Sequence, residues 1–422
     1  MTAKKKATKK ATPKRKTTKA APTAQDDTGA TERQVPLAEE RHAEELAFLA
    51  AVDDGPRPPG WRLSARAVVT FIIGSDGEAL RAPAKLALPK KQMVISQKFV
   101  GDQALVERCV VTLAGERGLL LVGEPGTAKS MISELLAAAI CGTSTLTVQG
   151  TAGTTEEHLR YGWNYALLIA RGPCPEALVP SPVLRAMQQG SIARIEEVTR
   201  CLPEVQDALV SILSDRRLAI PELVDGDPDQ NLESNAGSTV FARPGFNMIA
   251  SANLRDRGVS EMSAALKRRF NFETVEPIAN IAMETALVKQ QATAALQRVG
   301  SDLEVDDAVL EALVMAFRDL RSGRSVEGWA VERPGTVMST AEAVSVATSM
   351  GLQQAYLPDD RDVLATLPGY LLGVVLKDEP KDRGRLLAYW DGAISRRAED
   401  GARLWKQLLE LRQTLEETQP SA

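Results

Sequence analysis

One loop of the sequence has the residue types and the spacing needed to hold a phosphorylated ligand. Gly123-Glu-Pro-Gly-Thr-Ala-Lys-Ser130 follows a short apolar run and precedes a segment of helical spacing. A turn in that position directs its backbone N–H groups, and the start of the next helix, at phosphate oxygens. Lys129 would reach the β- and γ-phosphates of a nucleoside triphosphate, and the Ser130 hydroxyl would ligate Mg²⁺. The expected phosphate-contacting residues are Gly123, Glu124, Pro125, Gly126, Thr127, Ala128, Lys129 and Ser130.

Ala128 departs from the usual pattern of phosphate loops, in which glycine precedes the lysine. Alanine tolerates the start of a helix but disfavours a positive φ angle. The alternative is an ordinary turn that carries a lysine by chance. The preceding apolar run, the spacing and the Lys-Ser pair together favour nucleotide binding.

Two adjacent carboxylates, Glu196 and Glu197, follow the buried run that begins at Ser191. A strand that ends in two acids would place them at the edge of the sheet that faces the phosphates. Glu196 would organise Mg²⁺ directly or through water, and Glu197 would orient and deprotonate the attacking water. Arg194 interrupts the apolar run, and Glu196 stands where aspartate is usual, so its extra methylene would weaken the metal geometry. The alternative is a solvated charge pair at the start of a helix.

These motifs need a sheet that brings them together. From about residue 97 to residue 277, short apolar runs alternate with segments of helical spacing. The runs predict buried strands at 118–122, 145–148, 192–195 and 246–250. Strands that alternate with helices form a parallel sheet, and ligands bind at its carboxyl edge. The sequence therefore predicts an α/β fold, with both motifs at that edge.

The N-terminal region has a different composition. Residues 1–20 hold nine Lys or Arg and no acid, whereas the whole chain has a net charge of −4. We expect residues 1–35 to be a disordered basic tail, more plausibly a solubilising tail than a tether for nucleic acid. In 36–96 we expect a helix over 38–52, a proline-rich linker over 53–60, and short strands and turns over 61–95.

The composition also excludes several classes of protein. The four cysteines form no CxxC pair and the chain has only two histidines, which argues against a disulfide framework, a zinc site and a Ser-His-Asp triad. No apolar run reaches the roughly 20 residues of a membrane span, and the basic N-terminus lacks the apolar core of a secretory signal. A cytoplasmic protein is expected.

The motifs together resemble those of the MoxR-type AAA+ ATPases, close to the branch that includes the regulatory ATPase RavA. The resemblance covers about residues 97–380. Members of that branch can carry an Ala-Lys-Ser loop, as at Ala128. Glu196-Glu-Val-Thr-Arg200 resembles the family's Asp-Glu-Ile-Asn-Arg stretch, and 204–214 resembles the helix that follows it.

Further family positions can be placed by this resemblance. Phe246-Asn-Met-Ile-Ala-Ser-Ala-Asn253 resembles the sensor 1 strand, with Asn253 as the sensor and Asn247 too far away at the other end. Ala265-Leu-Lys-Arg-Arg-Phe270 resembles the arginine-finger segment, with Arg269 preferred and Arg268 second. The stretch at 339–343 has no arginine where the family carries sensor 2, and the sequence leaves open whether the nearby Arg333 takes that place.

The resemblance also implies an architecture and a function. The expected fold is a parallel five-stranded sheet flanked by helices over 97–277, with a helical lid and C-terminal helices over 278–422. We expect ATP and Mg²⁺ as cofactors and a homo-oligomeric ring, most plausibly a hexamer. The ring would hydrolyse ATP to remodel or mature a protein client, with a von Willebrand factor A domain protein as partner. The alternatives are an ATP-binding switch with little turnover and a nucleic-acid motor.

Overall fold

The computed structural model describes residues 33, 35–83, 89–223, 238–253, 260–357, 362–377 and 379–417. The basic tail expected over 1–35 lies outside that set except for residues 33 and 35. One compact unit of the chain begins at Leu37.

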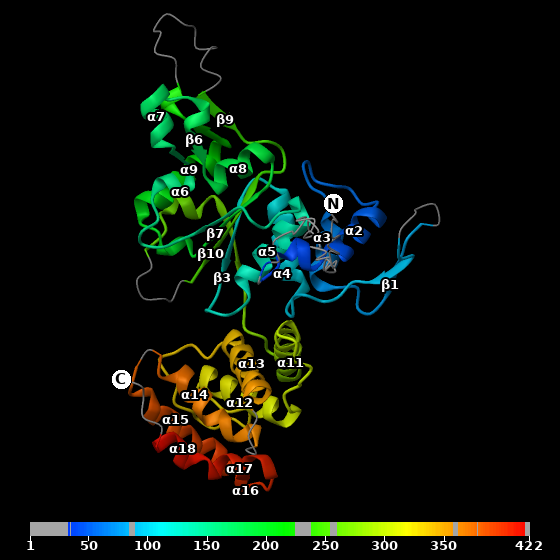
Figure 1. Ribbon diagram of the computed structural model, residues 1–422, viewed down its shortest axis with the longest axis vertical. Helices are drawn as coiled ribbons and strands as arrows, with labels where there is room; N and C mark the ends of the chain where they lie inside the picture. The colour runs from blue at the N-terminus through cyan, green and yellow to red at the C-terminus, as the bar shows by residue number, and fades with distance from the viewer. Residues whose placement is uncertain are drawn as a thin grey trace, which may run out of the picture. The chain divides into compact units, whose positions relative to one another are not determined.

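A parallel five-stranded sheet forms the centre of the first half of the chain (Figure 1). The strand order is β11-β3-β10-β7-β4, and each neighbouring pair is parallel. This sheet, with the helical domain that follows it, confirms the predicted fold class. The strands are β3 (Gly118–Val122), β4 (Thr147–Gln149), β7 (Ile192–Glu196), β10 (Asn247–Ala252) and β11 (Phe270–Thr274).

The three central strands are fully buried because both faces of the sheet are covered. In β3, Leu119 and Leu121 pack into the hydrophobic cluster on one face, and Leu120 and Val122 pack into the cluster on the other. One face is covered by α4 (Gln103–Ala114) and α5 (Lys129–Cys141), and the opposite face by α8 (Pro182–Gln189) and α9 (Pro203–Asp215).

The segment before the sheet packs into the same cluster as α5. It forms α1 (Ala38–Arg41), α2 (Ala43–Val52), α3 (Ala65–Ile73) and the antiparallel hairpin of β1 (Ala79–Arg81) and β2 (Gln92–Val94). The prediction of short strands over 61–95 was therefore wrong for 65–73. Ala67, Val68, Phe71 and Ile72 recur at helical spacing and are buried, so this stretch folds as a helix.

Two further antiparallel hairpins extend from the core. β5 (Tyr161–Trp163) pairs with β6 (Leu178–Pro180), and β8 (Arg217–Ala219) pairs with β9 (Thr239–Phe241). Tyr161 and Trp163 pack edge to face, as expected from aromatic packing. Short helices lie beside these hairpins and before β11, namely α6 (Glu156–Leu159), α7 (Tyr165–Arg171) and α10 (Ala264–Lys267).

The second half of the chain is helical, with one hydrophobic cluster of its own. Its helices are α11 (Ile281–Arg298), α12 (Asp307–Ser322), α13 (Thr340–Tyr356), α14 (Leu367–Val375), α15 (Asp382–Tyr389), α16 (Ser395–Glu399), α17 (Arg403–Glu410) and α18 (Arg412–Glu417), with a π-helical turn at Trp390–Ile394.

Three short helices, rather than one long helix, cover the stretch from 395 to 417. Gly401 has φ = +100°, a conformation that a continuing helix cannot contain. Ala398 and Leu408 are buried, and Leu411 packs against the hydrophobic cluster of the helical domain. None of the helices in the described ranges has both the length and the apolar character that crossing a bilayer requires.

Candidate functional site

The phosphate loop joins the carboxyl end of β3 to the start of α5. Gly123 and Gly126 have φ angles of 157° and 74°. At Gly126 an added Cβ would lie 2.4 Å from the Ser339 side chain, so both the backbone angle and the available space require glycine there. The loop is therefore closely packed as well as tightly turned.

Ala128 adopts the left-handed conformation, with φ = 69° and ψ = 19°, and is the N-cap of α5. Alanine disfavours a positive φ angle. This angle explains why phosphate loops usually carry glycine before the lysine, and it stores about 1 kcal/mol of strain at Ala128.

Lys129 is buried, and its ammonium group points back into the loop. Its Nζ donates hydrogen bonds to the carbonyl oxygens of Gly123, at 2.9 Å, and Glu124, at 2.7 Å. The lysine therefore lies inside the turn, where the charged end of a triphosphate would also lie.

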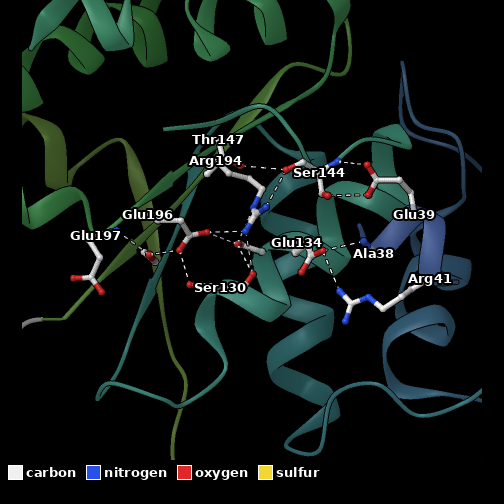
Figure 2. Close-up of polar contacts among 12 residues, drawn as sticks. Ala38, Glu39, Arg41, Ser130, Glu134, Ser144, Thr147, Arg194, Glu196 and Glu197 are labelled. Carbon is white, nitrogen blue, oxygen red and sulfur yellow. Dashed lines mark hydrogen bonds and ion pairs between the residues drawn. The ribbon is translucent and has the colours of Figure 1, made fainter. Parts of the chain in front are cut away.

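Glu196 lies at the end of β7, with its carboxylate directed at the start of α5 (Figure 2). Its Oε2 accepts hydrogen bonds from Ser130 Oγ at 2.8 Å and Ser251 Oγ at 2.7 Å. Its Oε1 accepts from Ser133 Oγ at 2.7 Å and Arg194 Nη2 at 2.9 Å. The two predicted metal ligands, Ser130 and Glu196, are thus in direct contact.

The surroundings of Glu196 favour its charged form. Burial alone would raise the pKa of this carboxyl, but hydrogen bonds from Ser251, Ser133 and Ser130 and the charge of Arg194 lower it below its usual range. A carboxylate beside a hydroxyl is a suitable oxygen donor set for Mg²⁺, so the residues present fit the expected ion.

Glu197 points away from this cluster and is about one-third exposed. Its Oε2 lies 3.1 Å from Arg200 Nε, while its backbone N–H donates to Ser251 Oγ. Its backbone is left-handed, with φ = 57°, which is uncommon for glutamate. The two adjacent acids therefore lie in different surroundings, one enclosed and one open to solvent.

The two asparagines of the sensor-like strand also have different surroundings. Asn253 follows β10, is 2% exposed, and lines a cavity of ≈ 280 Å³ together with Gly123, Glu124 and Val275. Asn247, at the other end, donates from Nδ2 to the carbonyl oxygens of Leu113, Gly115 and Arg117. The prediction that Asn247 lies away from the phosphate loop is confirmed.

The two candidate finger arginines lie between α10 and β11. Arg269 donates from Nε to Ser214 Oγ and from Nη1 to the Ala265 carbonyl, both at 2.7 Å. Arg268 is exposed, and the structure records no side-chain hydrogen bond or ion pair for it within the described ranges. The geometry therefore leaves Arg268, rather than the preferred Arg269, available to another subunit.

At the sensor 2 position, Ser339 and Ala341 at the start of α13 lie against Gly126. Arg333 packs its side chain against Gly323, at the end of α12. Nearby, Arg321 donates to the buried Glu284 and to the Met338 carbonyl, which fixes the segment before α13.

Sequence reasoning missed the full polar environment of Glu196. Arg194 was read only as an interruption of an apolar run, yet it is 8% exposed and contacts Glu196. Strand periodicity was the available signal, because Arg194 and Glu196 are two residues apart on one strand and share a face. No pattern around Ser133 or Ser251 indicated that both would donate to the same carboxylate.

Comparison with known proteins matches both halves of the chain. Residues 118–270 match a family described as "AAA domain (dynein-related subfamily)", and residues 282–416 match the "YehL-like AAA+ ATPase C-terminal domain". The protein YehL of Escherichia coli is 46% identical over 362 residues, which cover 86% of this chain and 93% of YehL. The chain belongs to the YehL family of AAA+ ATPases. ATP binding is typical of AAA domains.

More distant similarities add little to this assignment. An uncharacterised protein of Staphylococcus haemolyticus, SH1500, is 26% identical over 263 residues, covering 62% of this YehL-family chain and 90% of that protein. Among solved structures, NtrX of Brucella abortus in complex with ATP covers 76% of this chain and 69% of its own, at 15% identity and a TM-score of 0.42. That likeness is too weak to support an argument.

Proposed function

We propose that this YehL-family protein hydrolyses ATP with Mg²⁺, and that the reaction takes place at the edge of the sheet where β3 and β7 end. The observation that carries the proposal is the direct contact between the Ser130 hydroxyl and the Glu196 carboxylate. Ser130 directly follows Lys129, whose ammonium group lies inside the phosphate loop. Mg²⁺ would supply charge neutralisation at the phosphates. The loop amides and Lys129 would bind and orient the triphosphate.

The remaining groups would act on the attacking water. Glu197 is exposed enough to meet solvent, and it would accept the water's proton after its pairing with Arg200 is released. Asn253 lines the same cavity as the start of the phosphate loop, which suits a hydrogen bond to the γ-phosphate or the water. Glu196 would stay deprotonated and organise the metal.

A ring is part of the proposal because the finger would act in trans. AAA ATPases commonly form oligomers, and a hexamer is the expected size. The exposed guanidinium of Arg268 suits a finger better than Arg269, whose donors are used within its own chain. Arg333, packed at the end of α12, is a weaker candidate for sensor 2 than its sequence position suggested.

The purpose of hydrolysis would be to remodel or mature a protein client. The MoxR-type resemblance implies such a client. That resemblance also suggests a partner with a von Willebrand factor A domain. The only support for a nucleic-acid motor is the basic composition of residues 1–20, which lie outside the described residues.

The test is ATP turnover by the purified protein and two variants. Lys129→Ala should abolish ATP binding, and Glu197→Gln should preserve binding while it lowers kcat by about 100-fold or more, since a general base supplies roughly that factor. Equal kcat values in all three proteins would refute the hydrolysis proposal. A pull-down with Glu197→Gln and ATP would then search for the client.

A second function, an ATP-binding switch with little turnover, is favoured by one observation. Glu197 is held by Arg200, and a base held in an ion pair is not ready to accept a proton. Arg200→Ala separates the two functions: a rise in kcat would show that the ion pair restrains an active enzyme. Tight ATP binding with negligible turnover in both proteins would support the switch.

A further inference from the structure

Arg194 is an arginine in a central strand of the sheet, and it is 8% exposed. A buried guanidinium is costly unless charge and hydrogen bonds compensate it. Its Nε donates to Ser133 Oγ at 3.0 Å, and its Nη1 donates to the Ser144 carbonyl at 2.9 Å. Its Nη2 donates to the Ser130 carbonyl at 3.1 Å and to Glu196 Oε1 at 2.9 Å. Arg194 therefore contacts both residues that are expected to ligate the metal, Ser130 through its carbonyl oxygen and Glu196 through its carboxylate.

The contacts continue from Arg194 to the N-terminal helix α1 (Figure 2). Ser144, which is buried, donates from its backbone N to Glu39 Oε1 at 3.0 Å and from Oγ to Glu39 Oε2 at 2.8 Å. These two hydrogen bonds to Glu39 fix the position of Ser144. The Ser144 carbonyl oxygen in turn accepts the hydrogen bond from Arg194. Glu39 thus reaches Glu196 through two intervening residues.

A second contact joins α1 to the helix that carries Ser130. The Ala38 backbone N donates to Glu134 Oε1 at 2.9 Å, and Arg41 Nη2 lies 3.1 Å from the same oxygen. Glu134 follows Ser130 by one helical turn on α5. Helix α1 therefore contacts α5, which carries Ser130, and it contacts Ser144, the residue whose carbonyl accepts from Arg194 of β7.

We propose that Arg194 positions the Glu196 carboxylate for Mg²⁺, and that Glu39 of α1 holds Arg194 in that position through Ser144. The proposal rests on the proposed function, because it assigns a task to the site where Mg²⁺ is expected. Arg194 and Glu39 are positioning residues in this scheme, since each acts on the metal only through another side chain.

The geometry explains why Glu196 needs a positioning residue. Glutamate has one more rotatable bond than the aspartate usual at this place, so its carboxylate needs more fixed donors to stay in one orientation. When Ser130 turns to ligate Mg²⁺, Glu196 loses one of its four donors. Arg194 and Ser133 still hold Oε1, and Ser251 still holds Oε2. The carboxylate can then face the ion without reorienting.

The test measures the Mg²⁺ concentration that gives half-maximal tightening of ATP binding, by titration of the full chain with a fluorescent ATP analogue. Arg194→Lys keeps the charge but cannot donate to four acceptors in one plane. It should raise that concentration about 10-fold, the usual effect of losing a residue that orients a metal ligand. Glu39→Gln should raise it about 3-fold, because an amide retains one acceptor for Ser144.

Controls separate positioning from general stability. Binding of the analogue in EDTA should be unchanged in both variants, because neither residue contacts the phosphate loop's amides. Glu44→Gln is the matched control, since Glu44 lies on the neighbouring helix in an exposed pair with Lys90, outside this chain of contacts. It should leave the Mg²⁺ dependence unchanged. The double variant should be no worse than Arg194→Lys alone, because Glu39 acts through Arg194.

The outcomes distinguish the two proposals. Unchanged Mg²⁺ dependence in Arg194→Lys, or in Glu39→Gln, would overturn the inference even if the parent protein hydrolyses ATP. Independent, multiplying effects in the double variant would also overturn it. If Arg194→Lys does not fold, the Glu39→Gln and Glu44→Gln pair still decides the result. A parent protein that binds ATP equally with and without Mg²⁺ would refute the proposed function as well.

Discussion

At the scale of single residues, Ala128 is the clearest case of a residue type that does not suit its backbone conformation. The sequence shows an alanine where phosphate loops usually have glycine. The left-handed backbone at this position explains why glycine is usual there. Glu196 shows the opposite case. Its position could be predicted, but three of its four hydrogen bonds come from serines of α5 and β10 that are far away in sequence. The spacing of residues in the sequence carries no information about such long-range contacts.

The left-handed angle of Ala128 leads to a prediction about stability. Ala128→Gly should raise the free energy of unfolding by about 1 kcal/mol, because glycine adopts φ = 69° without strain. Urea denaturation of the nucleotide-free protein measures this change. Ala47→Gly is the control, since Ala47 is an exposed residue within α2. It should lower stability by about 0.5–1 kcal/mol. A loss of stability in both variants would contradict the assigned strain.

At the scale of elements, the buried strands could be predicted because continuous apolar runs ended in polar motifs. Strand bounds shifted by one or two residues, as in β4 and β10, where apolar character and hydrogen bonding end at different places. The helix at 65–73 was missed because its four buried residues lie in a short stretch flanked by turns. The break between helices at Gly401 could not be predicted, because a glycine in a sequence does not reveal its φ angle.

The junction between α1 and α2 should respond to pH. His42 stands there with its ring edge-on to Phe71. Burial first, and the charge of Lys98 second, lower the pKa of His42 from 6.5 to about 4. The unfolded chain therefore takes up this proton at a higher pH than the folded chain, so stability is lost as pH falls from 6.5 towards 4.

His42→Gln should remove that part of the pH dependence. The difference in unfolding free energy between pH 7 and pH 4.5 should be roughly 1–3 kcal/mol smaller in the variant than in the parent. Urea titrations at the two pH values measure it. Among the carboxylates, Glu45 acts on the pKa of His42, so the comparison measures His42 together with that interaction. An identical pH dependence in the two proteins would refute the lowered pKa.

At the scale of the whole molecule, the order of the five strands brings β3, β10 and β7 together at the centre, and their carboxyl ends carry all the central motifs. This convergence could be predicted from the alternation of strands and helices, and it holds in the structure. Assembly with other copies is a different matter. The sequence favoured Arg269 as finger by its place before Phe270, whereas hydrogen bonding within the chain engages that residue.

Mixing two inactive variants tests the trans role of Arg268. Arg268→Ala should keep a working phosphate loop but lose the arginine finger. Lys129→Ala should keep the arginine finger but lose ATP binding at its own phosphate loop. Each alone should have little turnover, and an equimolar mixture should regain a measurable part of the parent activity. Arg269→Ala should instead lower the melting temperature, because it loses its bonds to Ser214 and Ala265. No gain on mixing, although the variants co-assemble, would contradict a finger in trans.

The convergence of the phosphate loop and Glu196 on one metal-bound nucleotide is best tested by an experimental structure of Glu197→Gln with ATP and Mg²⁺. We expect Ser130 Oγ about 2.1 Å from the ion, with Glu196 beside it at direct or water-mediated distance. We also expect Lys129 Nζ to leave the carbonyls of Gly123 and Glu124 for the β- and γ-phosphates. Nucleotide bound elsewhere, with Lys129 still on those two carbonyls and Ser130 still on Glu196, would contradict the account.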